Sequence, residues 1–334
     1  MHDKRSKRLV INGLIEQRWV KSSNEPSDKM IVLCAMKILI SGGSGLVGSL
    51  LIAKLVAQGN AVINLTTKKN LKSYHPQIVQ SYWNPSTGEF NASEVNAFDA
   101  VINLAGYNVS NRWTKETKEV LVSSRINSTN LLIKICEQAE KKPQTFISTS
   151  ASGYYRSSTE LQHEEAKAGQ GFLSDLTLAW ENATMPAVQM GMRRVILRVG
   201  VVLDQNDGAL AKMVPFFKLG LGSATGSGEQ YMSWIHLDDL VNLYIHALEK
   251  NIEGTFNANA PGTCTNAVFS KALAKALDKP FFFPNVPAFA LKLLFGEMSS
   301  MLVNSQRISS EKIAQTGFKF QYPQIDAALN EIYS

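Results

Sequence analysis

Short apolar runs alternate along the chain with longer stretches in which apolar residues recur every three or four positions. Short runs are typical of buried strands, and the longer spacing is typical of helices. Strands are predicted at 37–41, 61–65, 99–104, 145–150 and 194–199. Helices are predicted after Gly48, at about 114–140, after Gly171, and near 237–249, 266–277 and 288–295. This alternation predicts an α/β fold with a doubly wound parallel sheet of the Rossmann type.

The first predicted strand runs directly into a glycine-rich turn. Gly42, Gly45 and Gly48 recur every third residue, and a helical pattern follows. This arrangement is typical of dinucleotide sites, because the backbone can approach the pyrophosphate and the helix N-terminus offers free N–H groups. Glycines also serve plain turns, but the flanking strand and helix favour the binding site. The predicted cofactor contacts of the turn are Gly42, Ser44, Gly45, Leu46, Val47 and Gly48.

The segment after the second predicted strand indicates which dinucleotide binds. NAD sites usually carry an Asp or Glu about 20 residues beyond the glycines, where it binds the ribose hydroxyls. Residues 61–74 contain no acidic residue, but they include Thr67, Lys68, Lys69 and Lys72. Ammonium groups attract a 2′-phosphate that a carboxylate would repel. The segment therefore favours NADP(H) over NAD(H), with Thr67 and Lys68 as contacts; the alternative is that the lysines coat a solvated turn.

Composition and charge divide the chain into three parts. Residues 1–35 carry seven basic and four acidic residues, which account for half of the net charge of +6. We expect a disordered basic extension there, with Met36 as the native first residue. Residues 36–190 are predicted to form the nucleotide-binding domain, with later strands joining its sheet. Residues 191–334, where glycine and proline become frequent, are expected to form a smaller substrate-facing part.

The composition is otherwise that of an ordinary globular protein, with 45% apolar and 19% charged residues. Cys34, Cys136 and Cys264 are far apart, and we expect reduced thiols in a cytoplasmic protein. The scattered histidines offer no metal site. No apolar run can span a bilayer, and basic and aromatic residues do not interleave in the folded part. We therefore expect neither a membrane nor a nucleic-acid partner, although the basic extension leaves both open as weaker alternatives.

Several motifs occur together in the rest of the chain. They are the glycine turn, Trp83-Asn84-Pro85, Asn103-Leu104-Ala105-Gly106, Arg112-Trp113-Thr114, Ser124-Arg125, Ser150-Ala151-Ser152-Gly153-Tyr154-Tyr155, Trp180-Glu181, Arg198-Val199-Gly200, Gly226-Ser227-Gly228-Glu229-Gln230, Ser233-Trp234-Ile235-His236-Leu237-Asp238-Asp239, Gly296-Glu297-Met298, Gln306-Arg307 and Gly317-Phe318. With them the chain from Met36 onward resembles the epimerase-like atypical short-chain dehydrogenase/reductase family, often labelled after a supposed cell-division inhibitor. The resemblance implies an extended Rossmann fold, NADP(H) binding, a sugar-epimerase-like ancestry and a small family-specific domain at about 280–330.

The helix predicted after Gly171 differs from that of relatives that transfer a hydride. Such relatives use a Tyr-x-x-x-Lys pair on the helix after the hydroxyl-ended strand, where the lysine lowers the tyrosine pKa and the phenolate takes a proton. Alignment through Glu181 puts Leu173 at the tyrosine position and Thr177 at the lysine position. Residues 172–189 contain neither tyrosine nor lysine. The usual base is therefore missing.

Three residues are candidates for catalysis in its place. Ser150 ends a predicted strand beside the expected nicotinamide and can polarise a carbonyl group. Tyr154, or its neighbour Tyr155, follows closely and is a candidate for a displaced base, with Lys118 or Arg125 as a source of positive charge. Arg112 lies after the strand at 99–104, where loops face the cleft and an arginine can bind a carboxylate or phosphate. Packing or surface roles are the alternative for each residue.

The end of the strand at 99–104 supplies the remaining predicted cofactor contacts. Asn103, Ala105 and Gly106 form the strand end and its turn, and Arg125 lies on the following helix. Ser150 is assigned to the cofactor site as well as to catalysis.

Two function classes are consistent with these residues. The first is an NADP-dependent epimerase-like oxidoreductase that acts on a small polar, sugar-like substrate. The second is a non-catalytic NADPH-binding regulator or redox sensor that has lost its base. The sequence identifies no substrate and leaves a homodimer open.

Overall fold

The computed structural model describes residues 35–334. The predicted extension at 1–35 lies outside the described residues, apart from Ala35. An eight-stranded sheet forms the centre of the structure, in the order β12-β8-β6-β5-β1-β2-β3-β4. Its strands pair in parallel, except that β4 runs antiparallel to β3. The predicted doubly wound α/β fold is therefore confirmed.

The strands of this sheet are short and have buried centres. They are β1 (Lys37–Ser41), β2 (Ala61–Thr66), β3 (Ile78–Asn84), β4 (Glu89–Phe90), β5 (Ala100–Asn103), β6 (Thr145–Ala151), β8 (Arg193–Val199) and β12 (Gly254–Ala258). Three further pairs of strands are β7 (Ser158–Gln162) with β14 (Gln306–Ile308), β9 (Val201–Leu203) with β11 (Trp234–His236), and β10 (Tyr231–Met232) with β13 (Cys264–Thr265).

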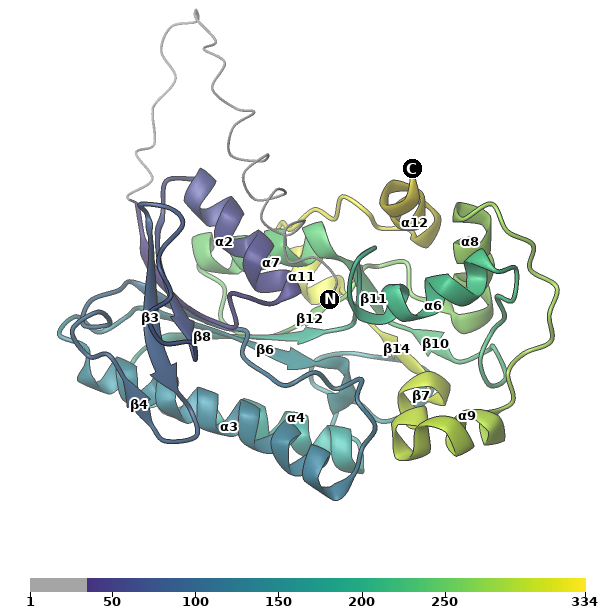
Figure 1. The fold of residues 1–334 in the computed structure, drawn as a ribbon, viewed down its shortest axis with the longest axis horizontal. Helices are drawn as coiled ribbons and strands as arrows, with labels where there is room; N and C mark the ends of the chain where they lie inside the picture. Colours follow the sequence, from purple (N-terminus) through teal and green to yellow (C-terminus); the bar gives the residue numbers. More distant parts are fainter. Residues whose placement is uncertain (1–34) are drawn as a thin grey trace, which may run out of the picture.

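Helices cover both faces of the sheet (Figure 1). On one face lie α2 (Leu46–Ala57), α7 (Leu237–Glu249) and α11 (Glu311–Gln315), and on the other lie α3 (Lys115–Gln138) and α4 (Phe172–Ala183). The remaining helices are η1 (Ser152–Tyr154), α5 (Met185–Gln189), α6 (Gly208–Lys218), α8 (Asn266–Ala276), α9 (Ala288–Phe295), η2 (Gly296–Ser299), α10 (Ser300–Val303) and α12 (Ile325–Tyr333).

Strand β1 shows why the sheet is buried on both faces. Ile38 and Ile40 belong to the apolar cluster beneath α2 and α7, whereas Leu39 belongs to the cluster beneath α3. Successive side chains of a strand point to opposite faces. A run without polar positions is therefore what a central parallel strand requires.

The C-terminal part contributes to the same sheet and also builds a cluster of its own. Strands β8 and β12 form one end of the sheet, so the chain returns to it after leaving at β9. Helices α6, α8 and α12 enclose a separate apolar core around Trp234 and Phe269. The C-terminal segment also reaches back, because β14 pairs with β7 in parallel.

One local prediction is wrong. Helix α2 begins at Leu46 rather than after Gly48, because Gly45 already has the extended backbone of an N-cap residue. His236 is the N-cap residue of α7, and its ring accepts a hydrogen bond from the Asp238 N–H. Asp238 pairs with Lys54 of α2 at 2.5 Å, which connects two helices on one face.

Candidate functional site

The turn between β1 and α2 depends on glycine at several positions. Gly42 has a φ of +74°, and a Cβ there would lie 2.7 Å from the carbonyl carbon of Leu104. A Cβ on Gly48 would lie 2.4 Å from the Gly42 oxygen and 2.6 Å from the Gly43 Cα. At Gly45 a Cβ would meet only the Gly42 oxygen, at 3.3 Å. Gly42 and Gly48 thus allow close packing, while Gly45 keeps the outer side of the turn open.

The first turn of α2 has the chemical features of an anion-binding site. Gly45 provides no side-chain cap, and the first turn carries no acidic residue. The N–H groups of such a turn have no intrahelical partners, and the helix dipole adds partial positive charge there. These groups can hold a diphosphate, as the sequence predicted for Ser44, Leu46 and Val47.

The end of β5 is held by a buried network around Asn103. Its side-chain oxygen accepts a hydrogen bond from the Ser41 hydroxyl at 2.8 Å. Its Nδ2 donates to Thr129 at 3.0 Å and to Ser148 at 3.3 Å. The side-chain oxygen also accepts a hydrogen bond from the Ala105 N–H at 3.3 Å, so Asn103 holds the turn at Ala105 and Gly106, and its own cofactor contact stays a prediction.

Arg125 lies against this turn without a carboxylate partner among the described residues. Its guanidinium donates to the carbonyl oxygens of Leu121 at 3.1 Å and Tyr107 at 3.2 Å. A Cβ on Gly106 would lie 3.2 Å from the guanidinium carbon. Burial lowers the pKa of Arg125 to about 10, so it is charged at neutral pH. The structure therefore places a positive charge beside the turn at Gly106, where the sequence predicts a cofactor contact.

The loop after β2 is exposed and basic. Thr67, Lys68 and Lys72 are exposed, and none of the three lysines there forms an ion pair in residues 35–334. Lys69 lies over the ring of Tyr82, 5.0 Å from its centroid. Because β2 lies next to β1, its carboxyl end lies beside the glycine turn. The ammonium groups of this loop are thus available to an anion.

Ser150, at the end of β6, is bound to a buried ion pair. Its hydroxyl donates to Oε1 of Glu181 at 2.6 Å, and Arg198 donates to both oxygens of the same carboxylate, at 2.8 Å and 2.9 Å. All three side chains are buried. With its proton committed to Glu181, the Ser150 oxygen keeps only lone pairs for another group. Toward any further group, such as a ligand, Ser150 can therefore accept a hydrogen bond but not donate one.

The two tyrosines after β6 have different surroundings. The Tyr155 hydroxyl donates to Asn257 at 2.6 Å and accepts from Arg198 at 2.9 Å, and burial raises its pKa to about 12. Tyr154 is half-buried, and its hydroxyl makes no hydrogen bond within the described part of the chain. The guanidinium of Arg198 lies 3.4 Å from the Tyr154 ring centroid. Of the two, Tyr154 has the hydroxyl that is free to meet a ligand.

Helix α4 is apolar where relatives carry their base. Leu173 and Phe172 pack in one cluster with Trp113 and with Met298 of the C-terminal segment. Thr177 donates its hydroxyl to the Leu173 carbonyl oxygen at 2.8 Å. Neither position can accept or deliver a proton, as the sequence indicated.

Arg112 lies on the exposed loop between β5 and α3. It forms no ion pair with any described residue, and a Cβ on Gly296 would lie 4.0 Å from its Nε. Lys118, the other basic residue considered near Tyr154, instead pairs with Glu297 of η2. The structure therefore puts both residues beside the C-terminal segment, and the catalytic role of Arg112 stays a prediction.

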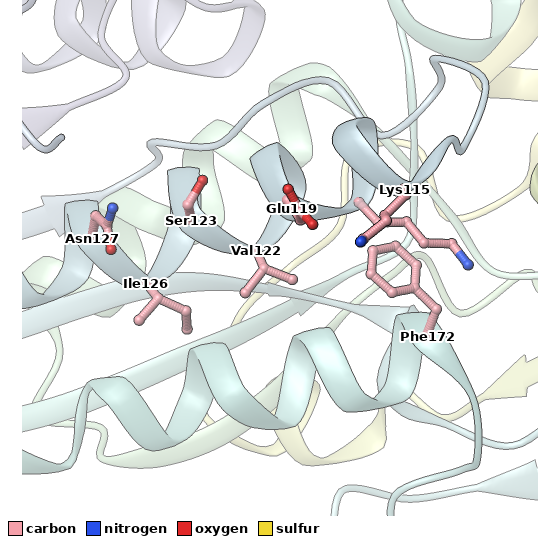
Figure 2. A pocket seen from close by; sticks show the side chains of 8 residues that line it. Lys115, Glu119, Val122, Ser123, Ile126, Asn127 and Phe172 are labelled. Atoms are coloured by element: carbon pink, nitrogen blue, oxygen red, sulfur yellow. The ribbon is translucent and has the colours of Figure 1, made fainter.

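An open hollow of about 500 Å³ lies elsewhere, along α3 (Figure 2). It is lined by Phe172 and by one outward face of α3 that includes Glu119, Val122 and Ile126. Its lining includes no residue of the turn between β1 and α2 and none of the loop after β2. The hollow therefore does not contain the segments for which the sequence predicts dinucleotide contacts.

Sequence reasoning did not find the role of Arg198. The signal was present, because an arginine inside the apolar run of a central strand requires a buried anion. Glu181 was noted only as an alignment marker, although it is that anion. Predicting the pair required knowledge that the β8 strand and α4 face each other.

Residues 35–334 contain no helix long and apolar enough to cross a membrane. They contain no cluster of three or more residues suited to a metal ion. Cys136 and Cys264 are free thiols.

Comparison with known proteins places the chain among epimerase-like proteins. Residues 38–258 match the model of the NAD dependent epimerase/dehydratase family, and residues 286–332 match a domain of unknown function, DUF1731. An epimerase family protein of Mycobacterium tuberculosis is 38% identical over 296 residues, with 87% of this chain and 96% of that protein covered. The mouse epimerase family protein SDR39U1 is 34% identical over 305 residues, with 89% and 99% covered.

Solved structures give the same result. The human epimerase family protein SDR39U1, solved with NADPH, has a TM-score of 0.78 and 31% identity, with 89% of this chain and 99% of that chain covered. The UDP-N-acetylglucosamine 4-epimerase of Bacillus cereus has a TM-score of 0.71 at 19% identity, with 90% and 98% covered. The second likeness, at this identity, shows the fold alone.

Proposed function

The chain belongs to the NAD dependent epimerase/dehydratase family, and on this premise we propose that it is an NADP(H)-dependent oxidoreductase for a small polar, sugar-like substrate. The observation that carries the proposal is the glycine turn, whose open helix N-terminus lies beside a basic loop without a carboxylate. Diphosphate binding requires the first feature, and a 2′-phosphate is favoured by the second.

The choice of NADP(H) has two independent supports. Residues 61–74 contain no acidic side chain to bind free ribose hydroxyls. The human relative, at 31% identity, was solved with NADPH. Thr67 and Lys68 are the residues that we propose for the 2′-phosphate, and Arg125 lies beside the turn at Gly106.

The chain's own groups would divide the remaining work. NADP(H), when bound, supplies or accepts the hydride. Tyr154 would contact the reacting oxygen with its free hydroxyl, and Ser150 would orient the substrate by accepting a hydrogen bond from it. Arg112 would bind an anionic group of the substrate from the exposed loop. Leu173 and Thr177 leave proton transfer to Tyr154 or to water.

A second function is favoured by one specific observation. The position of the usual tyrosine is part of an apolar cluster with Met298, so the helix lacks the tyrosine base of the hydride-transferring relatives. An NADPH-binding regulator or redox sensor needs the cofactor site and no base. Cytoplasmic location and a homodimer remain predictions under both functions.

The two functions differ in turnover. The protein is loaded with NADP, and polyols, sugar nucleotides and hydroxy acids are offered while absorbance at the nicotinamide band is followed. We expect reduction with at least one substrate and its loss in Tyr154→Phe and Arg112→Ala, while calorimetry shows that both variants still bind NADPH. Tight binding without turnover on the whole panel would favour the regulator. Absence of binding heat with either dinucleotide would contradict both.

A further inference from the structure

One surface of the C-terminal part exposes an unusual number of large apolar side chains. Phe289, Leu293 and Leu294 of α9 are 76%, 80% and 64% exposed. We define the C-terminal apolar patch as these residues together with Phe216, Leu219, Leu221, Phe282 and Phe283, all of which are exposed. Exposed apolar patches of this kind mark interaction sites.

Backbone contacts join the two segments that carry the patch. Val286 exchanges backbone hydrogen bonds with Ala224 at 2.8 Å and Gly226 at 2.9 Å. A Cβ on Gly220 would lie 3.9 Å from Pro280. The end of α6 and the approach to α9 are thus held together. Helix α9 lies at the edge of the molecule, away from the central sheet (Figure 1).

The charged residues around the patch indicate which kind of partner it binds. The segments 216–221 and 278–294 carry Lys218, Lys279 and Lys292 against the single acid Asp278. All four are exposed, and none forms an ion pair within residues 35–334. A helix with bulky apolar residues and neighbouring lysines is suited to the interface of an anionic bilayer, where phenylalanine and leucine enter the acyl boundary and lysines meet phosphates.

We propose that the C-terminal apolar patch docks the protein on an anionic membrane surface. A second copy of the chain fits less well, because a twofold contact through this face would gather six lysines. The proposal runs against the sequence-based expectation of no membrane partner, which considered only spans and the basic extension. It is independent of the proposed catalytic function, because no patch residue belongs to the cofactor or candidate catalytic set.

Vesicle co-sedimentation of the full chain tests the apolar part. We expect binding to phosphatidylcholine vesicles that contain phosphatidylserine and weaker binding to phosphatidylcholine alone. The double variant Phe289→Ser/Leu293→Ser should lose at least about tenfold in partition coefficient. The matched variant Leu161→Ser/Val188→Ser, which changes exposed apolar residues outside the patch, should bind as the parent does.

The charged part is tested with lysine variants. Lys218→Gln/Lys279→Gln/Lys292→Gln should lose about fivefold per lysine on phosphatidylserine vesicles. Changing Lys134, Lys167 and Lys319 to Gln removes the same charge from exposed positions elsewhere and should change binding less. Because residues 1–34 are basic and present in every variant, equal binding of both triple variants would place the contact outside the patch and overturn the proposal.

Depth of insertion gives a readout that misfolding does not imitate. The parent chain has five tryptophans of its own, so its quenching by brominated lipids is the baseline. The tryptophan added in Phe289→Trp should increase the quenching above this baseline, whereas that added in Leu161→Trp should not. Failure of the parent to bind anionic vesicles would overturn the proposal. So would patch-dependent dimerisation in size-exclusion chromatography without vesicle binding, which would assign the patch to a second copy.

Discussion

The turn after β1 and helix α4 differ in how far they carry the family's chemistry. The turn has glycine at Gly42, Gly45 and Gly48, and close backbone packing requires two of them. In and beside α4, Leu173 and Thr177 occupy the positions of the proton-transfer pair, and a buried Glu181–Arg198 pair holds Ser150. The glycine turn is therefore intact in this chain, whereas the tyrosine–lysine pair is replaced.

The contrast has a physical reason. Phosphate binding at such a turn uses backbone N–H groups, and a side chain added at Gly42 or Gly48 would overlap the backbone itself. Proton transfer uses side-chain atoms, which can be replaced while the helix and its packing remain. The helix can therefore lose its chemistry without loss of the fold, and the turn cannot.

The largest effect is expected at Gly48. In Gly48→Val the side chain would overlap the backbone of Gly42 and Gly43, which lie 2.4 Å and 2.6 Å from a Cβ at this position. We expect α2 to move away from the turn and calorimetry to show no NADPH binding. The control Gly88→Asn changes a glycine at positive φ with nothing within 4 Å, and it should bind normally. Unchanged affinity in Gly48→Val would refute the assignment of the turn.

The buried ion pair gives the next largest effect. Glu181→Gln leaves the Arg198 guanidinium without its counter-charge at a buried position, which typically costs about 3–5 kcal/mol of unfolding free energy. Urea unfolding measures this loss. The exposed pair between Arg156 and Glu160 provides the control, because Glu160→Gln should cost less than about 1 kcal/mol. Equal costs would show that the buried network is not structural.

Alkaline pH tests the burial of Tyr155. Burial raises the pKa of Tyr155 to about 12, whereas an unfolded tyrosine titrates near 10. The folded state holds this proton more tightly, so the stability contribution is complete below pH 10 and is lost as the pH rises to 12. Tyr155→Phe should remove about 2 kcal/mol of pH-dependent loss, measured as the difference in unfolding free energy between pH 9 and pH 12. An identical pH dependence in parent and variant would contradict this assignment.

The smallest effect concerns cofactor choice. Lys68→Glu puts a carboxylate where we propose that the 2′-phosphate binds, and NADPH affinity should fall about tenfold while NADH affinity stays level or rises. Paired calorimetric titrations measure both. Lys134→Glu makes the same charge change on an exposed position of α3 and should alter neither. Parallel losses for both dinucleotides would mean that the loop acts through general attraction.

Much of the fold could be predicted from local patterns. The strands at 37–41 and 61–65 and the helix at 288–295 have near-identical bounds in the structure, because apolar runs and capping residues act over a few positions. The start of α2 was missed because Leu46 and Val47 look like part of the turn until Gly45 is seen as its N-cap. The cap at His236 was missed because a ring nitrogen as acceptor has a weaker local signal than an aspartate.

In the candidate site, too, features within one segment could be predicted and contacts between segments could not. Residue order alone identified the glycine turn, the basic loop and the loss of the tyrosine–lysine pair, since each lies within a single short segment. The commitment of Ser150 to Glu181, the ion pair with Arg198 and the closure of Leu173 by Met298 join segments far apart in the chain. Such contacts arise from the packing of β6, β8, α4 and the C-terminal segment, and no local pattern encodes which of these elements will meet.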